Sequence, residues 1–152
     1  AVTAIARAHF HYLKDHPVVP GDARVTLATE EPRKYNLLVM DAFQGGTIPV
    51  HLLTLEAFKE YQRHLKPNGV LAVNISNRRL NLAAVVNAAA HEMKWFSRTI
   101  ENQTETKGER DSRWILLTGD NETANALEAK PVKNASLLLW TDDHASLFDV
   151  WR

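Results

Sequence analysis

The sequence predicts an α/β fold built on a mostly parallel sheet that ends in an antiparallel strand pair. Two apolar runs, Tyr35–Met40 and Gly69–Ile75, have the length and composition of strands buried on both faces. Helical patterns alternate with these runs, which favours a parallel sheet with helices on both faces. A third apolar run, Arg113–Thr118, follows the polar segment Arg98–Thr106 after a short turn, so these two strands must pair antiparallel.

The first thirty residues predict two helical segments. A helix over Ala1–Lys14 is indicated by apolar residues at helical spacing, namely Val2, Ile5, Ala6, Phe10 and Leu13. No capping residue precedes it, so we expect the chain to begin inside a larger domain. Val18 and Val19 form a brief apolar stretch that predicts a short strand, and Asp22–Thr29 predicts one or two helical turns.

Capping residues predict where the later helices begin. Thr54 precedes a helix to Leu65 that turns Leu55, Phe58, Tyr61 and Leu65 inward. Asn81 precedes a helix whose inner stripe is Leu82, Val85, Val86, Ala89 and Met93. A short surface helix is expected over Asn121–Ala129, and Thr141 or Asp142 is expected to cap a last short helix.

Composition excludes several functional classes. The 152 residues suit one domain, and 18 basic residues balance 18 acidic ones, which argues against a dedicated nucleic-acid binder. The absence of cysteine excludes disulfides and thiolate sites. No apolar run approaches the ~20 residues that span a bilayer, and no signal peptide opens the chain. We therefore expect a cytoplasmic domain that does not itself span a membrane, and its zero net charge favours a homo-oligomer.

Polar residues at the carboxyl ends of the two buried strands are the candidate site. Ligands of such sheets bind beyond these ends, where Asp41 and the group Asn74, Ser76 and Asn77 lie. Asp41 can take a proton from an arriving amine, or it can simply end its strand. Asp22 can accept from the exocyclic amine of a purine, or cap the helix that follows it. His9 and His11 point apart on a helix, so we predict surface histidines and no metal site.

Several strings together resemble the spermidine synthase (polyamine aminopropyltransferase) family, in particular its spermidine-synthase-like branch. They are Gly21-Asp22-Ala23-Arg24, the strand ending in Asp41 with Ala42 and Phe43, Ile48-Pro49-Val50-His51-Leu52-Leu53-Thr54, Leu65–Val73, Ile75-Ser76-Asn77-Arg78 and Leu139-Trp140-Thr141-Asp142-Asp143. The resemblance covers nearly all of the chain. It implies a Rossmann-like, methyltransferase-type fold with a reversed final strand.

The resemblance also implies an activity and residue roles. The family transfers an aminopropyl group from decarboxylated S-adenosylmethionine to an amine, so the implied partners are a small nucleoside co-substrate and an amine, with no tightly bound cofactor. Asp41 is then the general base. Asp22 and Ala23 lie near the adenine, and Ile48, Pro49 and Leu52 lie along the nucleoside.

Two departures from the family pattern keep other functions open. Gln44 stands where true synthases carry a second Asp that holds the diamine, which makes Gln44 the substrate-binding candidate. The family's first βαβ portion, with its glycine-rich turn, is expected before Ala1. One alternative is a methyltransferase that uses S-adenosylmethionine, and another is a non-catalytic oligomeric interaction module that has lost the site.

Overall fold

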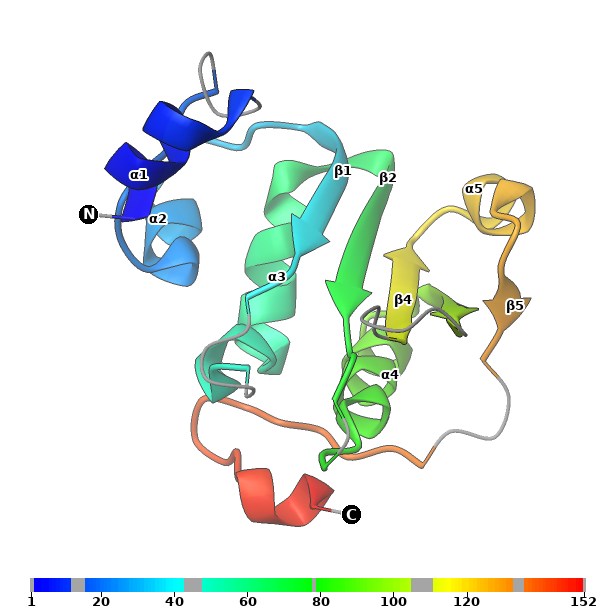
Figure 1. Ribbon diagram of the computed structural model, residues 1–152. Coiled ribbons are helices and arrows are strands. Elements are labelled where there is room, and N and C mark those ends of the chain that lie inside the picture. Colours follow the sequence, from blue (N-terminus) through cyan, green and yellow to red (C-terminus); the bar gives the residue numbers. More distant parts are fainter. Residues whose placement is uncertain are drawn as a thin grey trace.

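The computed structural model describes residues 2–11, 16–42, 48–77, 79–104, 111–132 and 136–151. Its centre is a five-stranded sheet in the order β1-β2-β4-β3-β5, with helices around it (Figure 1). The strands are β1 (Tyr35–Met40), β2 (Leu65–Asn74), β3 (Phe96–Asn102), β4 (Ser112–Thr118) and β5 (Lys130–Pro131). The helices are α1 (Val2–His9), α2 (Ala23–Thr29), α3 (Leu55–His64), α4 (Leu82–Glu92) and α5 (Asn121–Ala126), with short 3-10 helices η2 (Val50–Leu52) and η3 (Leu147–Val150).

The strand pairings make the sheet mixed, as an α/β fold with a C-terminal antiparallel pair requires. β1 and β2 are parallel, with Met40 opposite Val73. β2–β4, β3–β4 and β3–β5 are antiparallel. Among the described strands, parallel pairing is therefore confined to β1 and β2, whose carboxyl ends meet at one edge of the sheet.

One face of the sheet carries the hydrophobic core. Leu71 and Val73 of β2 and Ile115 and Leu117 of β4 are almost fully buried. They belong to one cluster with Phe58 and Tyr61 of α3 and Val85, Val86 and Ala89 of α4. Because strand side chains alternate between faces, this cluster lies on one side of the sheet, with α3 and α4 packed over it.

A buried histidine attaches α2 to α3. His64, the last residue of α3, is fully buried, and its Nδ1 accepts a hydrogen bond from the Arg33 backbone N–H at 3.3 Å. That acceptor role leaves the proton on Nε2, which lies 2.8 Å from the Leu27 carbonyl oxygen. Arg63 also donates to the carbonyls of Leu27 and Glu30. These bonds satisfy the carboxyl end of α2 and fix it against the end of α3.

Glycine at position 69 is required by the close approach of β1 and β2. The register of the pairing shifts between Tyr35 and Leu37. Tyr35 lies opposite Leu65 and Leu37 lies opposite Val70, so residues 66–69 of β2 lie opposite one residue of β1. A Cβ at Gly69 would come within 2.9 Å of the Tyr35 carbonyl oxygen and 3.0 Å of the Lys66 carbonyl oxygen. Only glycine avoids these backbone contacts, so Gly69 permits the register in which β1 ends at Met40 beside Val73.

The prediction that Tyr35–Met40 is buried on both faces is wrong. β1 is at the edge of the described sheet, and the side chains of Tyr35, Leu37 and Val39 are 38%, 55% and 53% exposed. Only Leu38 and Met40 face the core. The apolar composition identified a strand correctly, but it does not determine whether a neighbour covers each face.

Three other expectations also need correction. The first helix ends at His9 rather than Lys14, and Ile5 and Phe10 of its apolar stripe are 59% and 53% exposed. Val18 and Val19 are exposed coil instead of a strand. The last short helix is η3, which is capped by the Ser146 hydroxyl and not by Thr141 or Asp142.

Candidate functional site

Asp41 is held at the carboxyl end of β1 by a residue of the neighbouring strand. Asn74, the last residue of β2, donates from Nδ2 to Asp41 Oδ1 at 2.9 Å. The Asn74 amide is oriented in turn, since its Oδ1 accepts the Ser76 backbone N–H at 2.8 Å. Asp41 is exposed, and among the described residues its Oδ2 has no hydrogen-bond partner. One oxygen is therefore fixed and the other can accept from a ligand.

Asp22 performs two functions at the start of α2. Its Oδ1 accepts the backbone N–H groups of Arg24 at 2.9 Å and Val25 at 3.0 Å, so it is the helix cap that the sequence allowed as one of its roles. Its Oδ2 lies 2.8 Å from His51 Nε2. The Val25 amide and then His51 lower the pKa of the Asp22 carboxyl. Asp22 is thus an anion that touches the loop carrying Pro49.

Arg24 and Asp142 form an ion pair with two hydrogen bonds. Arg24 donates from both terminal nitrogens to the two Asp142 oxygens, at 2.7 and 2.5 Å. Arg24 also donates to the His51 carbonyl oxygen and to Thr54 Oγ1, and Thr54 donates to Asp142 at 2.8 Å. The Arg24 bond lowers the pKa of Asp142 to about 2. Three segments distant in sequence are therefore held together at one place.

The C-terminal segment completes this arrangement. The Leu55 backbone N–H donates to the Trp140 carbonyl oxygen at 2.8 Å, and the Asp142 backbone N–H donates to Glu56 at 3.0 Å. In Figure 1 this segment, in orange and red, crosses the end of the molecule toward which β1 and β2 point. It therefore borders the same end of the sheet as Asp41 and Asn74.

The other nucleoside-contact candidates divide between core and surface. Ile48 and Leu52 are buried at 1% and 4% exposure and belong to the hydrophobic core, with the Leu52 carbonyl oxygen accepting the Tyr61 hydroxyl at 2.9 Å. Ala23 is exposed and Pro49 is half-buried. Gln44 lies outside the described residues. Ala23 and Pro49 are therefore the ones placed where a ligand can reach them.

The sequence analysis did not predict that His51 contacts Asp22 or that Arg24 pairs with Asp142. It assigned Asp142 a role as a helix cap, which Ser146 has instead. Arg24 and Asp142 lie in two of the sequence strings that carry the family resemblance. Their place in these strings is the one feature of the sequence that could have indicated a shared role. Nothing local pairs them, because 118 residues separate the two side chains. His51 carries no signal beyond its place between Pro49 and Thr54.

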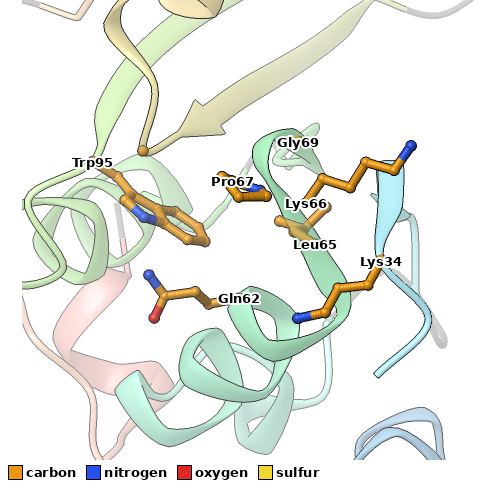
Figure 2. A pocket seen from close by; sticks show the side chains of 8 residues that line it. Lys34, Gln62, Leu65, Lys66, Pro67, Gly69 and Trp95 are labelled. Carbon is orange, nitrogen blue, oxygen red and sulfur yellow. The ribbon is translucent and has the colours of Figure 1, made fainter. Parts of the chain in front are cut away.

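A cavity of about 260 Å³ lies elsewhere, at the amino ends of the parallel strands. Its lining includes Lys34 before β1, Gln62 of α3 and Trp95 after α4 (Figure 2). The start of β2, from Leu65 to Gly69, forms another wall. Because Asp41 follows the opposite end of β1, this cavity is not the site that the sequence predicts.

Across the described ranges, no group of three or more histidine or acidic side chains is arranged to hold a metal ion. Within the same residues, no helix is long and apolar enough to cross a bilayer.

Two of the curated proteins that match part of the chain are polyamine aminopropyltransferases. Over 75 residues the chain is 36% identical to a probable polyamine aminopropyl transferase of Bifidobacterium longum, covering 49% of this chain and 17% of that protein. Over 77 residues it is 39% identical to a polyamine aminopropyltransferase of Vibrio vulnificus, covering 48% and 26%. The chain thus matches about a quarter or less of the length of these relatives. No protein-family profile matches the chain.

Two further similarities bear on fold and chemistry. Over 73 residues the chain is 33% identical to an N-terminal histidine N-methyltransferase of Emericella nidulans, covering 45% of this chain and 13% of that protein. The fold is similar to a probable spermidine synthase from Corynebacterium glutamicum, with a TM-score of 0.54 at 24% identity over 76% of this chain and 43% of that one. The Rossmann-like, methyltransferase-type fold is therefore confirmed, as is the resemblance to the spermidine synthase family over about half the chain.

Proposed function

We propose that this chain carries the amine-activating part of an aminopropyltransferase site, with Asp41 as general base. The observation that carries the proposal is the Asp41–Asn74 pair. A carboxylate with one oxygen fixed and one free stands where the only parallel strands among those described end together. The similarity to polyamine aminopropyltransferases supplies the reaction class.

The chemistry requires a base at this position. A primary amine is an ammonium ion near neutral pH and has no lone pair with which to attack. The free Asp41 oxygen can orient the ammonium group and accept its proton. The amine nitrogen then bonds to the carbon beside the sulfonium of decarboxylated S-adenosylmethionine, while the carbon–sulfur bond breaks and its electron pair returns to sulfur. The products are an aminopropylated amine and methylthioadenosine.

The nucleoside is expected to bind on the side of Asp22 and Pro49. The Asp22 carboxylate can accept a hydrogen bond from the exocyclic amine of adenine, with its Oδ2 shared with or released by His51. The exposed Ala23 and the half-buried Pro49 offer apolar surface on this side. Gln44 is the proposed contact for the acceptor amine. A neutral amide binds a second ammonium group less strongly than a carboxylate, so we expect acceptors less highly charged than a diamine.

A second candidate is methyl transfer from S-adenosylmethionine. It is favoured by the similarity to a histidine N-methyltransferase and by the glutamine at position 44. The same base and the same nucleoside contacts serve this reaction, because an amine again attacks carbon bound to a sulfonium. The two co-substrates differ in one carboxylate, so a direct comparison separates the reactions.

Asp41→Asn is the decisive variant for both reactions. Purified chain is incubated with each sulfonium co-substrate and a set of amines, and the released nucleoside is measured by chromatography. We expect Asp41→Asn to lower amine transfer by about 10²–10⁴, the usual contribution of a general base, while nucleoside binding changes little. The matched control is Asp143→Asn, which removes an exposed carboxylate elsewhere.

Two outcomes would contradict the proposal. Activity of Asp41→Asn within a few-fold of the parent would make Asp41 a structural residue. Failure of the parent to bind or turn over either co-substrate would favour the non-catalytic interaction module.

A further inference from the structure

The cavity at the amino ends of the parallel strands carries polar side chains that the fold leaves without partners. Its volume is about 260 Å³, and its lining includes Lys34, Gln62 and Lys66. Lys66 is already in use, because its Nζ donates to Asn36 Oδ1 at 2.8 Å. In the part of the chain that the structure describes, the side chains of Lys34 and Gln62 make no hydrogen bond or ion pair. Within those residues the cavity therefore holds an unpaired ammonium group and an unpaired amide.

Trp95 forms an apolar wall of this cavity, and the backbone around it fixes its place. Lys94 ends α4 with a φ of 56°, and the next backbone N–H, that of Trp95, donates to the Ala90 carbonyl oxygen at 2.8 Å. The indole ring then lies against the turn after β4, where a Cβ at Gly119 would come within 3.1 Å of Trp95 Nε1. Because Trp95 also packs against the hydrophobic core, its ring is held at this place.

Lys34 is held in a backbone conformation that glycine usually adopts. Its φ is 55°, in the left-handed region that is unfavourable for a residue with a Cβ. The residue before it is fixed, since the Arg33 backbone N–H donates to the buried His64. In Figure 2 the Lys34 side chain points toward Gln62. Conformations of this kind concentrate at ligand contacts, so a lysine at this position is better explained by a ligand than by local stability.

We propose that this cavity binds a small organic anion, an aromatic ring that bears a carboxylate or phosphate group. The ring would lie against Trp95 and Pro67, and the anionic oxygens would accept hydrogen bonds from the Lys34 ammonium and the Gln62 amide. The lining that the structure describes includes no acidic side chain to repel such a ligand. Pockets for drug-sized ligands are about 300–1,000 Å³, so a cavity of about 260 Å³ suits one ring and its substituent.

This site is separate from the one that contains Asp41. Apart from Lys34, its lining comes from the end of α3, the start of β2 and the turns after α4 and β4, and β2 and β4 are paired in the sheet. Asp41 follows the opposite end of β1. The proposal does not rest on the reaction proposed above, so Asp41→Asn should bind the anion as the parent does.

Benzoate and phenyl phosphate are suitable probes, with benzamide as the neutral control. Each tryptophan side chain gives one indole N–H signal in a two-dimensional NMR spectrum, and Trp95→Phe identifies the signal of Trp95. We expect either anion to shift that signal in a saturable way and to leave those of Trp114, Trp140 and Trp151 in place. Benzamide should bind about tenfold more weakly or worse, because it has no charge to pair with Lys34. The anion that binds more tightly identifies the preferred acidic group.

Variants at Lys34 test which side chain holds the anion. Lys34→Gln should weaken binding about tenfold, whereas Lys34→Arg keeps the charge and should bind within a few-fold of the parent. The matched control is Lys59→Gln, which removes an exposed lysine of α3 outside the cavity lining. Gly119→Ala would displace the Trp95 ring and should also weaken binding. Thermal melting checks that each variant is folded, and the Lys34 series decides the question if Gly119→Ala is not.

Several results would overturn the proposal. One is a Trp95 signal that neither anion moves at millimolar concentration, and another is an equal shift of all tryptophan signals, which indicates non-specific binding. Benzamide that binds as tightly as benzoate would remove the role of charge. Lys34→Gln that binds as tightly as the parent would remove the role of this lysine, and with it the site as proposed.

Discussion

Asp142 connects the C-terminal segment to Arg24, and its ionised carboxylate contributes to stability in acid. Its pKa of about 2 in the folded protein lies below the ordinary value of 3.8, first because of the Arg24 hydrogen bonds. A lowered pKa stabilises the folded state above the ordinary value, and that stabilisation is lost as the pH falls from about 4 toward 2. The Asp142 side chain is 44% exposed, so solvent screening limits the contribution to about 1 kcal/mol.

Asp142→Asn should therefore lower the free energy of unfolding at neutral pH and flatten its decline between pH 4 and 2. Urea unfolding at a series of pH values measures both effects. Asp143→Asn, next to it in sequence, serves as the exposed control. Equal pH profiles for the parent and Asp142→Asn would show that the Arg24–Asp142 pair contributes nothing to stability.

The start of α3 is the element on which this network depends most. Thr54 Oγ1 accepts the Ala57 backbone N–H as the helix cap, accepts from Arg24 at 3.2 Å and donates to Asp142 at 2.8 Å. The Thr54 side chain is buried, so its polar partners have little access to water once the hydroxyl is removed. Loss of Thr54 thus affects both the helix and the ion pair beside it.

Thr54→Ala should destabilise the protein by about 1–2 kcal/mol, the range for losing a helix cap with further bonds. Thr54→Ser keeps the hydroxyl and should recover most of that loss. Denaturant unfolding of the three proteins gives the comparison. A Thr54→Ser variant as unstable as Thr54→Ala would assign the effect to the methyl group and its packing instead.

In the whole molecule, α2, the loop with Pro49 and the C-terminal segment meet at one end of the sheet, while the lysine-lined cavity lies at the other. A nucleoside bound near Asp22 would contact α2 and the loop with Pro49, which the bonds of the described residues join through the side chains of Asp22, Arg24 and His51. Binding should therefore stabilise the entire fold, by ~2.7 kcal/mol at a ligand concentration of 100 times the dissociation constant.

Methylthioadenosine should raise the melting temperature of the parent in a concentration-dependent way, and Asp22→Asn should reduce that rise. Adenosine tests whether the base alone is recognised, and uridine is the control for non-specific binding. A rise that is equal for the parent and Asp22→Asn would place the nucleoside elsewhere, and the cavity bordered by Trp95 would be the next site to test.

The local sequence pattern was enough to predict most of the helices and strands. β1, α3, α4 and the antiparallel pair β3–β4 follow from hydrophobic periodicity and turn residues. The predicted strand ends also identified Asp41 and Asn74 as candidate site residues, because the carboxyl ends of neighbouring parallel strands must lie side by side. Asp22 as a cap follows for a similar reason, since the cap bonds span only three residues.

By itself, then, the sequence determined the α/β class, the positions of the main strands and helices, and the location of Asp41 and Asp22. Only the tertiary structure decided that β1 lies at the edge of the described sheet, that Ile48 and Leu52 belong to the core, and that Arg24 pairs with Asp142. The physical reason is the range of the interactions. Periodicity and capping act over a few residues, whereas burial of a face and pairing across 118 residues depend on how distant segments pack.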